Sequence, residues 1–200
     1  MVAVEAVEPV GPVRRHLTER QADTVQRLAD AAVDEIRERG YEGLTVRNVA
    51  RRAGVAGATA YTYFASKDHL VAEVFWRRLQ TLPGVRVDRR RSPAARVVGA
   101  VRDVSVLVAD EPELAAACTT ALLARDPDVQ RLRDRIGATV HGRLAEALGD
   151  DGDATVLQAL DLAFSGAMLQ AGMGHLAYEE LADRMAEVAV LVVDGGGRQP

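Results

Sequence analysis

Residues 40–70 read GYEGLTVRNVARRAGVAGATAYTYFASKDHL, and this stretch decides the fold class. Thr45 stands where a helix N-cap belongs, because apolar residues recur on one helical face directly after it. That helix is about nine residues long and ends at Gly54, and another short helix runs on to about Phe64. Short helices joined by a glycine-containing turn predict a helix-turn-helix motif at about residues 45–64.

The last helix of this motif presents small side chains to solvent. With Ala60 and Phe64 turned inward at about 100° per residue, five side chains lie outward or on the flanks: Ala58, Thr59 and Thr62, flanked by Tyr61 and Tyr63. Small outward residues allow a helix to enter the major groove of DNA, and flanking phenols can reach phosphate oxygens. The alternative for each tyrosine is ordinary packing.

Cationic groups lie at the starts of the two helices that are expected to have Thr45 and Ser66 as N-caps. Lys67, the only lysine in the chain, follows the N-cap Ser66 of a further helix, where free N–H groups and the helix dipole attract an anion. Thr45 and Arg47 lie at the start of the preceding capped helix, where a hydroxyl and a guanidinium suit a phosphate or a base. A DNA phosphate is the simplest partner for Lys67. The alternative is that Lys67 is only solvated.

These residues closely resemble the DNA-binding signature of the TetR family of bacterial transcriptional regulators. The resemblance covers about residues 21–75 and rests on the glycine turn, the Tyr-x-Tyr-Phe end and the Ser-Lys cap at the family's spacing. It implies DNA contacts from the following residues: Thr45, Arg47, Thr59, Tyr61, Thr62, Tyr63 and Lys67. Gly57 and Ala58 depart from the longer polar or basic residues of many members, so base recognition would depend more on Arg47, Thr59, Thr62 and DNA shape.

The charge of the chain is unevenly distributed. The net charge is −4, yet residues 43–78 hold six basic and two acidic side chains. A cationic stretch inside an acidic protein indicates a face directed at a polyanion, and a solvated patch without function is the alternative.

The flanking sequence extends this picture on both sides. Apolar residues follow one buried helical stripe from Thr18 until Gly40, which we expect to end that helix as its C′ residue. The helix capped by Ser66 is expected to continue to about Pro83. We therefore expect a flexible tail at residues 1–17 and, at residues 18–82, a DNA-binding domain whose fourth helix links it to the rest.

Residues 83–194 predict a helical bundle for ligand binding and dimerisation. Helix starts are indicated at Ser92, around Pro112 and at Asp126, and the last two helices are expected at about 154–177 and 179–193, before a tail at 195–200. The complete expectation is an all-α protein of about nine helices, in which a three-helix helix-turn-helix domain precedes a C-terminal bundle.

The helix at about 154–177 is apolar around more of its circumference than one packing face requires. It needs a second partner, which predicts a homodimer through the last two helices, as in the family's dimers. Two heads spaced about 34–36 Å apart would then read both halves of a palindromic operator in double-stranded DNA. Small and flexible side chains predict an apolar effector pocket, with plain core filling as the alternative for each: Cys118, Thr119, Met168 and Met173. A phosphate-bearing acyl ligand stays open if the cluster Arg89-Arg90-Arg91 faces the pocket mouth.

Other classes of protein find little support. Apolar residues make up 48% and charged residues 27% of the 200-residue chain, which fits neither a disordered nor a membrane protein. No signal peptide and no apolar stretch near 18 residues occurs, and the single cysteine permits no intrachain disulfide, so we expect a cytoplasmic protein. The scattered histidines (His16, His69, His141 and His175) match no metal motif, and we expect no metal, cofactor or catalysis.

The sequence thus favours a repressor that binds DNA as a homodimer and is released by a small, apolar effector. Activation of transcription, in place of repression, stays open. The alternative is a helical small-molecule carrier with weak or no specific DNA binding.

Overall fold

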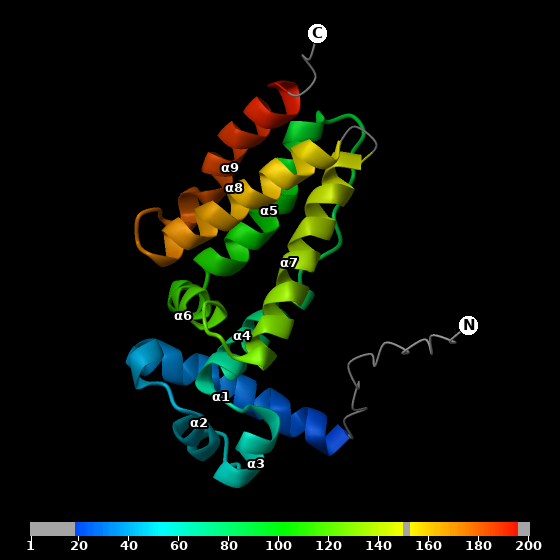
Figure 1. The fold of residues 1–200 in the computed structure, drawn as a ribbon. Coiled ribbons are helices and arrows are strands. Elements are labelled where there is room, and N and C mark those ends of the chain that lie inside the picture. The colour runs from blue at the N-terminus through cyan, green and yellow to red at the C-terminus, as the bar shows by residue number, and fades with distance from the viewer. Residues whose placement is uncertain (1–18, 150–152, 196–200) are drawn as a thin grey trace, which may run out of the picture.

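The computed structural model describes residues 19–149 and 153–195, and every regular element within them is helical. The all-α fold is therefore confirmed, with nine α-helices in the described part of the chain (Figure 1). The tail predicted at residues 1–17 lies outside the described residues, as does all but the first residue of the tail predicted at 195–200.

The first four helices form a head at one end of the molecule: α1 (Glu19–Gly43), α2 (Val46–Arg52), α3 (Gly57–Tyr63) and α4 (Lys67–Gln80). The prediction that α1 ends at Gly40 is supported by the backbone, which leaves the helical conformation there with a φ of 65°. Residues 41–43 add only a short turn, closed by the Leu44 N–H on the Tyr41 carbonyl at 3.2 Å.

The N-cap predicted at Thr45 and the glycine turn predicted at Gly54 are both confirmed. The Thr45 hydroxyl caps α2 by accepting the Asn48 N–H at 3.0 Å. Gly54 has a φ of 65°, which few other residues adopt, and Val55 N–H donates to the Ala50 carbonyl at 2.9 Å. α2 is seven residues long rather than about nine, because this turn begins directly after Arg52.

The remaining five helices form a body: α5 (Pro93–Ala109), α6 (Pro112–Leu122), α7 (Pro127–Leu148), α8 (Ala154–Gly172) and α9 (Leu181–Ala189). The predicted starts of α5 and α7 are confirmed, since Ser92 and Asp126 cap them and proline follows each cap. A 3₁₀ turn, Tyr178–Glu180, precedes α9, and a π-helical turn, Val190–Asp194, follows it.

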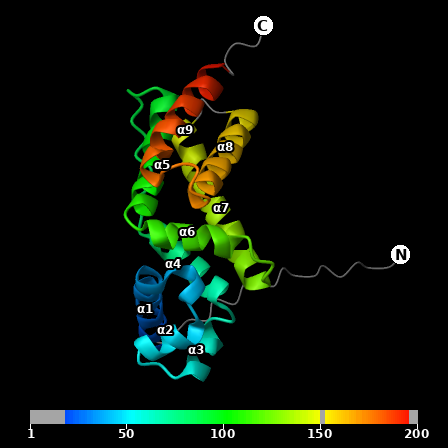
Figure 2. The same cartoon turned by 90° about the vertical axis from the view of Figure 1, so that its left-hand side faces the viewer.

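α6 lies crosswise between the head and the rest of the body, where it packs against α1 and α4 (Figure 2). α7 also contacts α4 and runs from the head toward the far end of the body (Figure 1). α5 packs between α7 and α9, and α8 contacts α6, α7 and α9. One cluster of buried apolar side chains extends from α1 to α9, so head and body share a continuous core.

The predicted end of α8 at about residue 177 is wrong. α8 ends at Gly172, because Gly174 takes a φ of 77° and the His175 N–H donates to the Gln170 carbonyl at 2.9 Å. This pattern is a helix-terminating Schellman turn, for which glycine is the preferred residue. A Cβ on Gly172 would also lie 2.5 Å from the Thr119 side chain, so α8 approaches α6 too closely there for a larger residue.

Candidate nucleic-acid interface and internal cavity

α3 turns its small side chains away from the core, as its periodicity predicts. Ala60 and Phe64 are buried, whereas Thr59 and Thr62 are exposed and Tyr61 is 54% exposed. Tyr63 differs from Tyr61, because it is half-buried and packs against the core. The alternative of ordinary packing therefore applies in part to the Tyr63 ring, whereas the Tyr61 ring is exposed to solvent.

The start of α2 lies beside this face. Thr45 is exposed, and its hydroxyl already accepts the Asn48 N–H. Arg47 is exposed and makes no hydrogen bond or ion pair within the described part of the chain. Its guanidinium is therefore available to a phosphate or to a base edge.

Lys67 lies at the start of α4 and is held in place by the end of α1. Its Nζ donates to the Tyr41 carbonyl at 3.2 Å and stands 4.0 Å above the centre of the Tyr41 ring. The Tyr41 hydroxyl in turn donates to Asp68, and burial together with this hydrogen bond raises the pKa of Tyr41. An ammonium has three donors, so Lys67 keeps N–H groups for a phosphate. The support from Tyr41 is a feature that sequence reasoning missed.

All seven residues that the resemblance implies thus come from the N-cap and first turn of α2, from α3 and from the start of α4; α2 and α3 lie at the end of the head away from the body (Figure 1). Gly57 is half-buried, and a Cβ there would meet nothing within 4 Å, so its glycine is not required by a close approach. Ala58 is exposed and ends in a methyl group, which leaves polar contacts to its neighbours.

Ion pairs neutralise three of the six basic side chains in the cationic stretch at residues 43–78. Arg52 pairs with Glu35 at 2.7 Å, Arg77 with Glu73 at 3.0 Å, and Arg78 with Glu111 at 2.8 Å. Two of these carboxylates, Glu35 and Glu111, lie outside the stretch and are buried. The positive charge left for a polyanion comes from Arg47, Arg51 and Lys67, which lie close to α3 rather than along the whole stretch.

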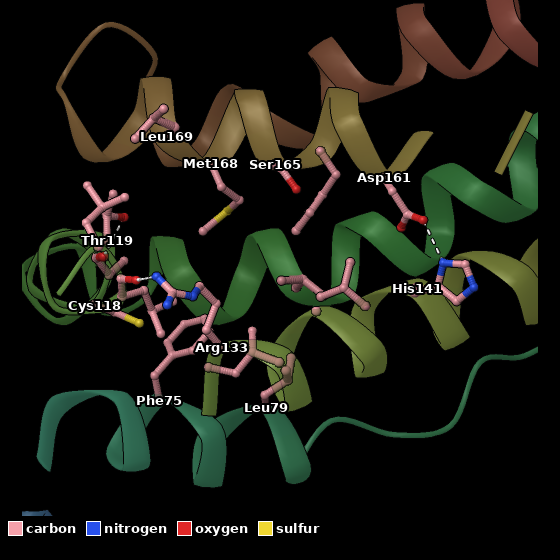
Figure 3. A pocket seen from close by; sticks show the side chains of 18 residues that line it. Phe75, Leu79, Cys118, Thr119, Arg133, His141, Asp161, Ser165, Met168 and Leu169 are labelled. Carbon is pink, nitrogen blue, oxygen red and sulfur yellow. Dashed lines mark hydrogen bonds and ion pairs between the residues drawn. The ribbon is translucent and has the colours of Figure 1, made fainter. Parts of the chain in front are cut away.

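A cavity of about 450 Å³ lies between α4, α5, α6, α7 and α8 (Figure 3). Cys118, Thr119 and Met168, three of the four residues predicted for a pocket, lie on its wall. Met173 does not line the cavity, because it follows the early end of α8 and is 54% exposed. Arg89, Arg90 and Arg91 are exposed and do not line it either, so they provide no anion site at its wall.

The cavity wall carries a few polar groups at defined places. Arg133 Nη1 donates to the Leu122 carbonyl at 2.6 Å, and His141 Nδ1 lies 2.6 Å from an Asp161 carboxylate oxygen (Figure 3). Cys118 is buried, and this burial raises the pKa of its thiol, which therefore stays protonated and is a poor nucleophile. Arg133 was not predicted, although its spacing from Ile136 and Val140 places it on the same helical face.

Two carboxylates, one on α6 and one on α7, connect the cavity wall to the head. Glu111, at the start of α6, binds Arg37 of α1 at 2.7 Å and Arg78 of α4 at 2.8 Å. Asp126, the N-cap of α7, accepts the hydroxyl hydrogen of Ser66, the N-cap of α4, at 2.8 Å. That hydrogen bond lowers the pKa of Asp126. These contacts join α6 to both α1 and α4, and α7 to α4.

Comparison with known proteins agrees with this geometry. Residues 28–74 match the family model described as bacterial regulatory proteins of the tetR family. The chain is 47% identical over 178 residues to the HTH-type transcriptional regulator Mb0790c of Mycobacterium bovis, covering 88% of this chain and 83% of that one. It is 26% identical over 190 residues to the HTH-type transcriptional repressor KstR of Rhodococcus jostii, covering 90% and 87%.

The fold is also similar to a solved TetR transcriptional regulator from Rhodococcus sp. RHA1, with a TM-score of 0.71 at 21% identity over 87% of this chain and 97% of that one. Within the described residues, no helix is long and apolar enough to cross a membrane. No group of three potential metal ligands occurs in the same part of the chain.

Proposed function

Because the chain belongs to the tetR family of bacterial regulatory proteins, we propose that it is a cytoplasmic repressor that binds a palindromic operator as a homodimer. A small molecule that enters the cavity releases it. In this proposal, residues 18–82 form the DNA-binding domain and residues 83–194 form the ligand-binding and dimerisation bundle. The catalytic machinery of an enzyme is not part of it, in keeping with the buried, protonated thiol of Cys118.

The outward face of α3 carries the proposal. Thr59, Tyr61 and Thr62 are exposed on a helix whose other side is anchored in the head core, so α3 can enter a major groove without unfolding. Thr45, Arg47, Tyr63 and Lys67 would contact the backbone or base edges on either side. Phosphate contacts fix the register, and the hydroxyl and guanidinium groups that reach bases supply selectivity.

The dimer is proposed to form through α8 and α9. Large apolar side chains are exposed along α8 and the turn after α9: Leu162, Leu169, Met173, Val190 and Leu191. A second copy of the same surface would remove them from water, as the two-fold symmetry of a palindrome requires. Replacement of Leu162, which is 69% exposed, by Glu should produce monomers in sedimentation experiments.

Repression is the proposed sign of regulation. Occupancy of an operator is enough to block polymerase, and the relative KstR is named a transcriptional repressor. Release follows from the contacts of Glu111 and Asp126, because the helices that they start, α6 and α7, also form the cavity wall. An effector that fits a displaced α6 would favour a head position that no longer matches the operator.

Selection and sequencing of genomic fragments bound by the full-length protein tests the proposal. We expect a palindromic motif and a footprint on it that Tyr61→Ala weakens, whereas Thr120→Ala, exposed on α6 and outside the proposed dimer surface, leaves it unchanged. A ligand carrier, the alternative, predicts bound fragments without a shared motif. Measurement of the motif's effect on a reporter gene separates repression from activation.

A further inference from the structure

Arg133 is a half-buried cation without a carboxylate partner in the described part of the chain. Three other half-buried arginines, Arg77, Arg78 and Arg143, each pair with a carboxylate at 3.0 Å or less. Arg133 instead donates one N–H, from Nη1, to the carbonyl of Leu122 at the end of α6. A guanidinium has five N–H donors, so this contact leaves most of its hydrogen-bonding capacity unused at the cavity wall.

The surroundings of Arg133 are mostly apolar. Phe75, Ile136 and Phe164 lie on the wall together with further aliphatic side chains. A cation beside such a surface favours a ligand that brings its own negative charge, because a neutral ligand would desolvate the guanidinium while leaving it only the Leu122 carbonyl as a partner. The same wall favours an aliphatic body for the rest of that ligand.

At the opposite end of the cavity, the one carboxylate among the described lining residues already has a partner. His141 lies eight residues after Arg133 on α7, which corresponds to about 12 Å along the helix axis. The carboxylate of Asp161 is already engaged with His141 at 2.6 Å (Figure 3). A cationic ligand would have to displace His141, whereas an anion meets available N–H groups at Arg133.

We propose that the cavity binds an aliphatic monocarboxylate, with its carboxylate on Arg133 and its chain directed along the apolar wall toward His141. This inference rests on the proposed function, because it names the chemistry of the effector. The carboxylate would form a paired, charge-assisted hydrogen bond with Arg133 Nη2 and Nε. Arg133 also binds the Leu122 carbonyl at the end of α6. The start of that helix carries Glu111, which binds the head.

Calorimetric titration of the full-length protein with decanoate, decanol and decylamine tests this proposal, at concentrations below micelle formation of the two ionic compounds and below the solubility limit of decanol. Decanoate should bind about tenfold to a hundredfold more tightly than decanol, as expected for one charged hydrogen-bonded pair. Octanoate should bind about 15-fold more weakly than decanoate, because two methylenes leave the apolar wall.

Three variants locate the anion site. Arg133→Gln should reduce the affinity for decanoate to that for decanol, whereas Arg133→Lys, which keeps the charge, should retain most of the preference. Arg135→Gln is the matched control, because Arg135 is exposed on α7 and does not line the cavity. If Arg133→Gln fails to fold, the comparison of the three decyl compounds on the unaltered protein and on Arg133→Lys still decides the question.

Equal binding of decanoate and decanol, a preference for decylamine, or no binding of any decyl compound would overturn the proposal. A preference for decylamine would assign the anchor to Asp161 instead. The proposed function is tested separately by the fragment selection, which uses no ligand. A protein that selects a palindrome but ignores decanoate would therefore keep the first proposal and lose the second.

Discussion

In the head, α2 and α3 turn Thr45, Arg47 and Thr59 toward solvent, whereas in the body α7 turns Arg133 toward a cavity. The head also neutralises many of its charges internally, as the pairing of Arg52 with Glu35 shows. Among the described residues of the body, Arg133 lies at an apolar wall without a carboxylate partner. The difference fits the two proposals, in which the head presents a fixed surface to DNA and the body binds a small ligand.

The largest expected effect concerns the core that both regions share. Leu28 in the head and Leu160 in the body are both fully buried. Replacement of either by Ala should lower the free energy of unfolding by about 2–5 kcal/mol. Because the apolar cluster is continuous from α1 to α9, both variants should shift one common transition in urea denaturation at fixed protein concentration.

Leu123→Ala provides the control for this experiment, because Leu123 is 66% exposed and should change stability little. Two separate transitions, with Leu28→Ala affecting only one of them, would show that head and body unfold independently.

The next effect concerns the exposed surface of the head. Arg47→Ala should weaken operator binding by about 1–3 kcal/mol, because its guanidinium has no other partner among the described residues. A loss that is equal on operator and random DNA, with a smaller salt dependence, would assign Arg47 to phosphate. A loss on the operator alone would assign it to a base edge. The measurement is a set of binding isotherms at several salt concentrations.

A smaller effect is expected at the junction between the two regions. Glu111→Gln keeps the shape of the side chain but removes the charge that holds Arg37 and Arg78. It should change the coupling between decanoate and operator binding by about 0.5–2 kcal/mol, measured as the shift in operator affinity at saturating decanoate. Glu113→Gln, exposed in the first turn of α6, is the matched control and should leave the coupling unchanged.

The smallest effect concerns Ser66. Ser66→Ala removes the N-cap of α4 and the hydrogen bond to Asp126, which should cost about 1 kcal/mol at neutral pH. The pKa of Asp126 is lowered in the folded state, so its contribution is present above the unfolded pKa and is lost as pH falls through the folded value. The difference in stability between wild type and Ser66→Ala should therefore narrow below about pH 4, and a constant difference would contradict this pairing.

The head could be predicted from sequence because its signals are local. Thr45, Gly54 and Ser66 act within five residues of their own positions, through caps and one glycine turn. The outward face of α3 could be predicted for the same reason, because residues three or four apart lie on one face of a helix. The charge pattern was harder to interpret, because Glu35 and Glu111 neutralise arginines that are distant in sequence.

The helices of the body could be predicted from sequence, but the residues that line its cavity could be predicted only in part. The end of α8 was misplaced because Gly174 lies in an otherwise apolar periodic stretch, and periodicity alone does not reveal a positive φ. Cys118, Thr119 and Met168 were placed on the wall, yet Arg133 was missed. It is one of several arginines on α7, and only the approach of α6 and α8 distinguishes it from its solvated neighbours.

Hydroxyl-radical footprinting of the full-length protein on its selected fragment tests the central claim most directly, namely that α3 enters DNA in two symmetric copies. Two protected segments, with centres about 34–36 Å apart and both weakened in Tyr61→Ala, are the predicted result. A single protected segment, or protection that is unchanged in Tyr61→Ala and Thr59→Ala alike, would contradict it.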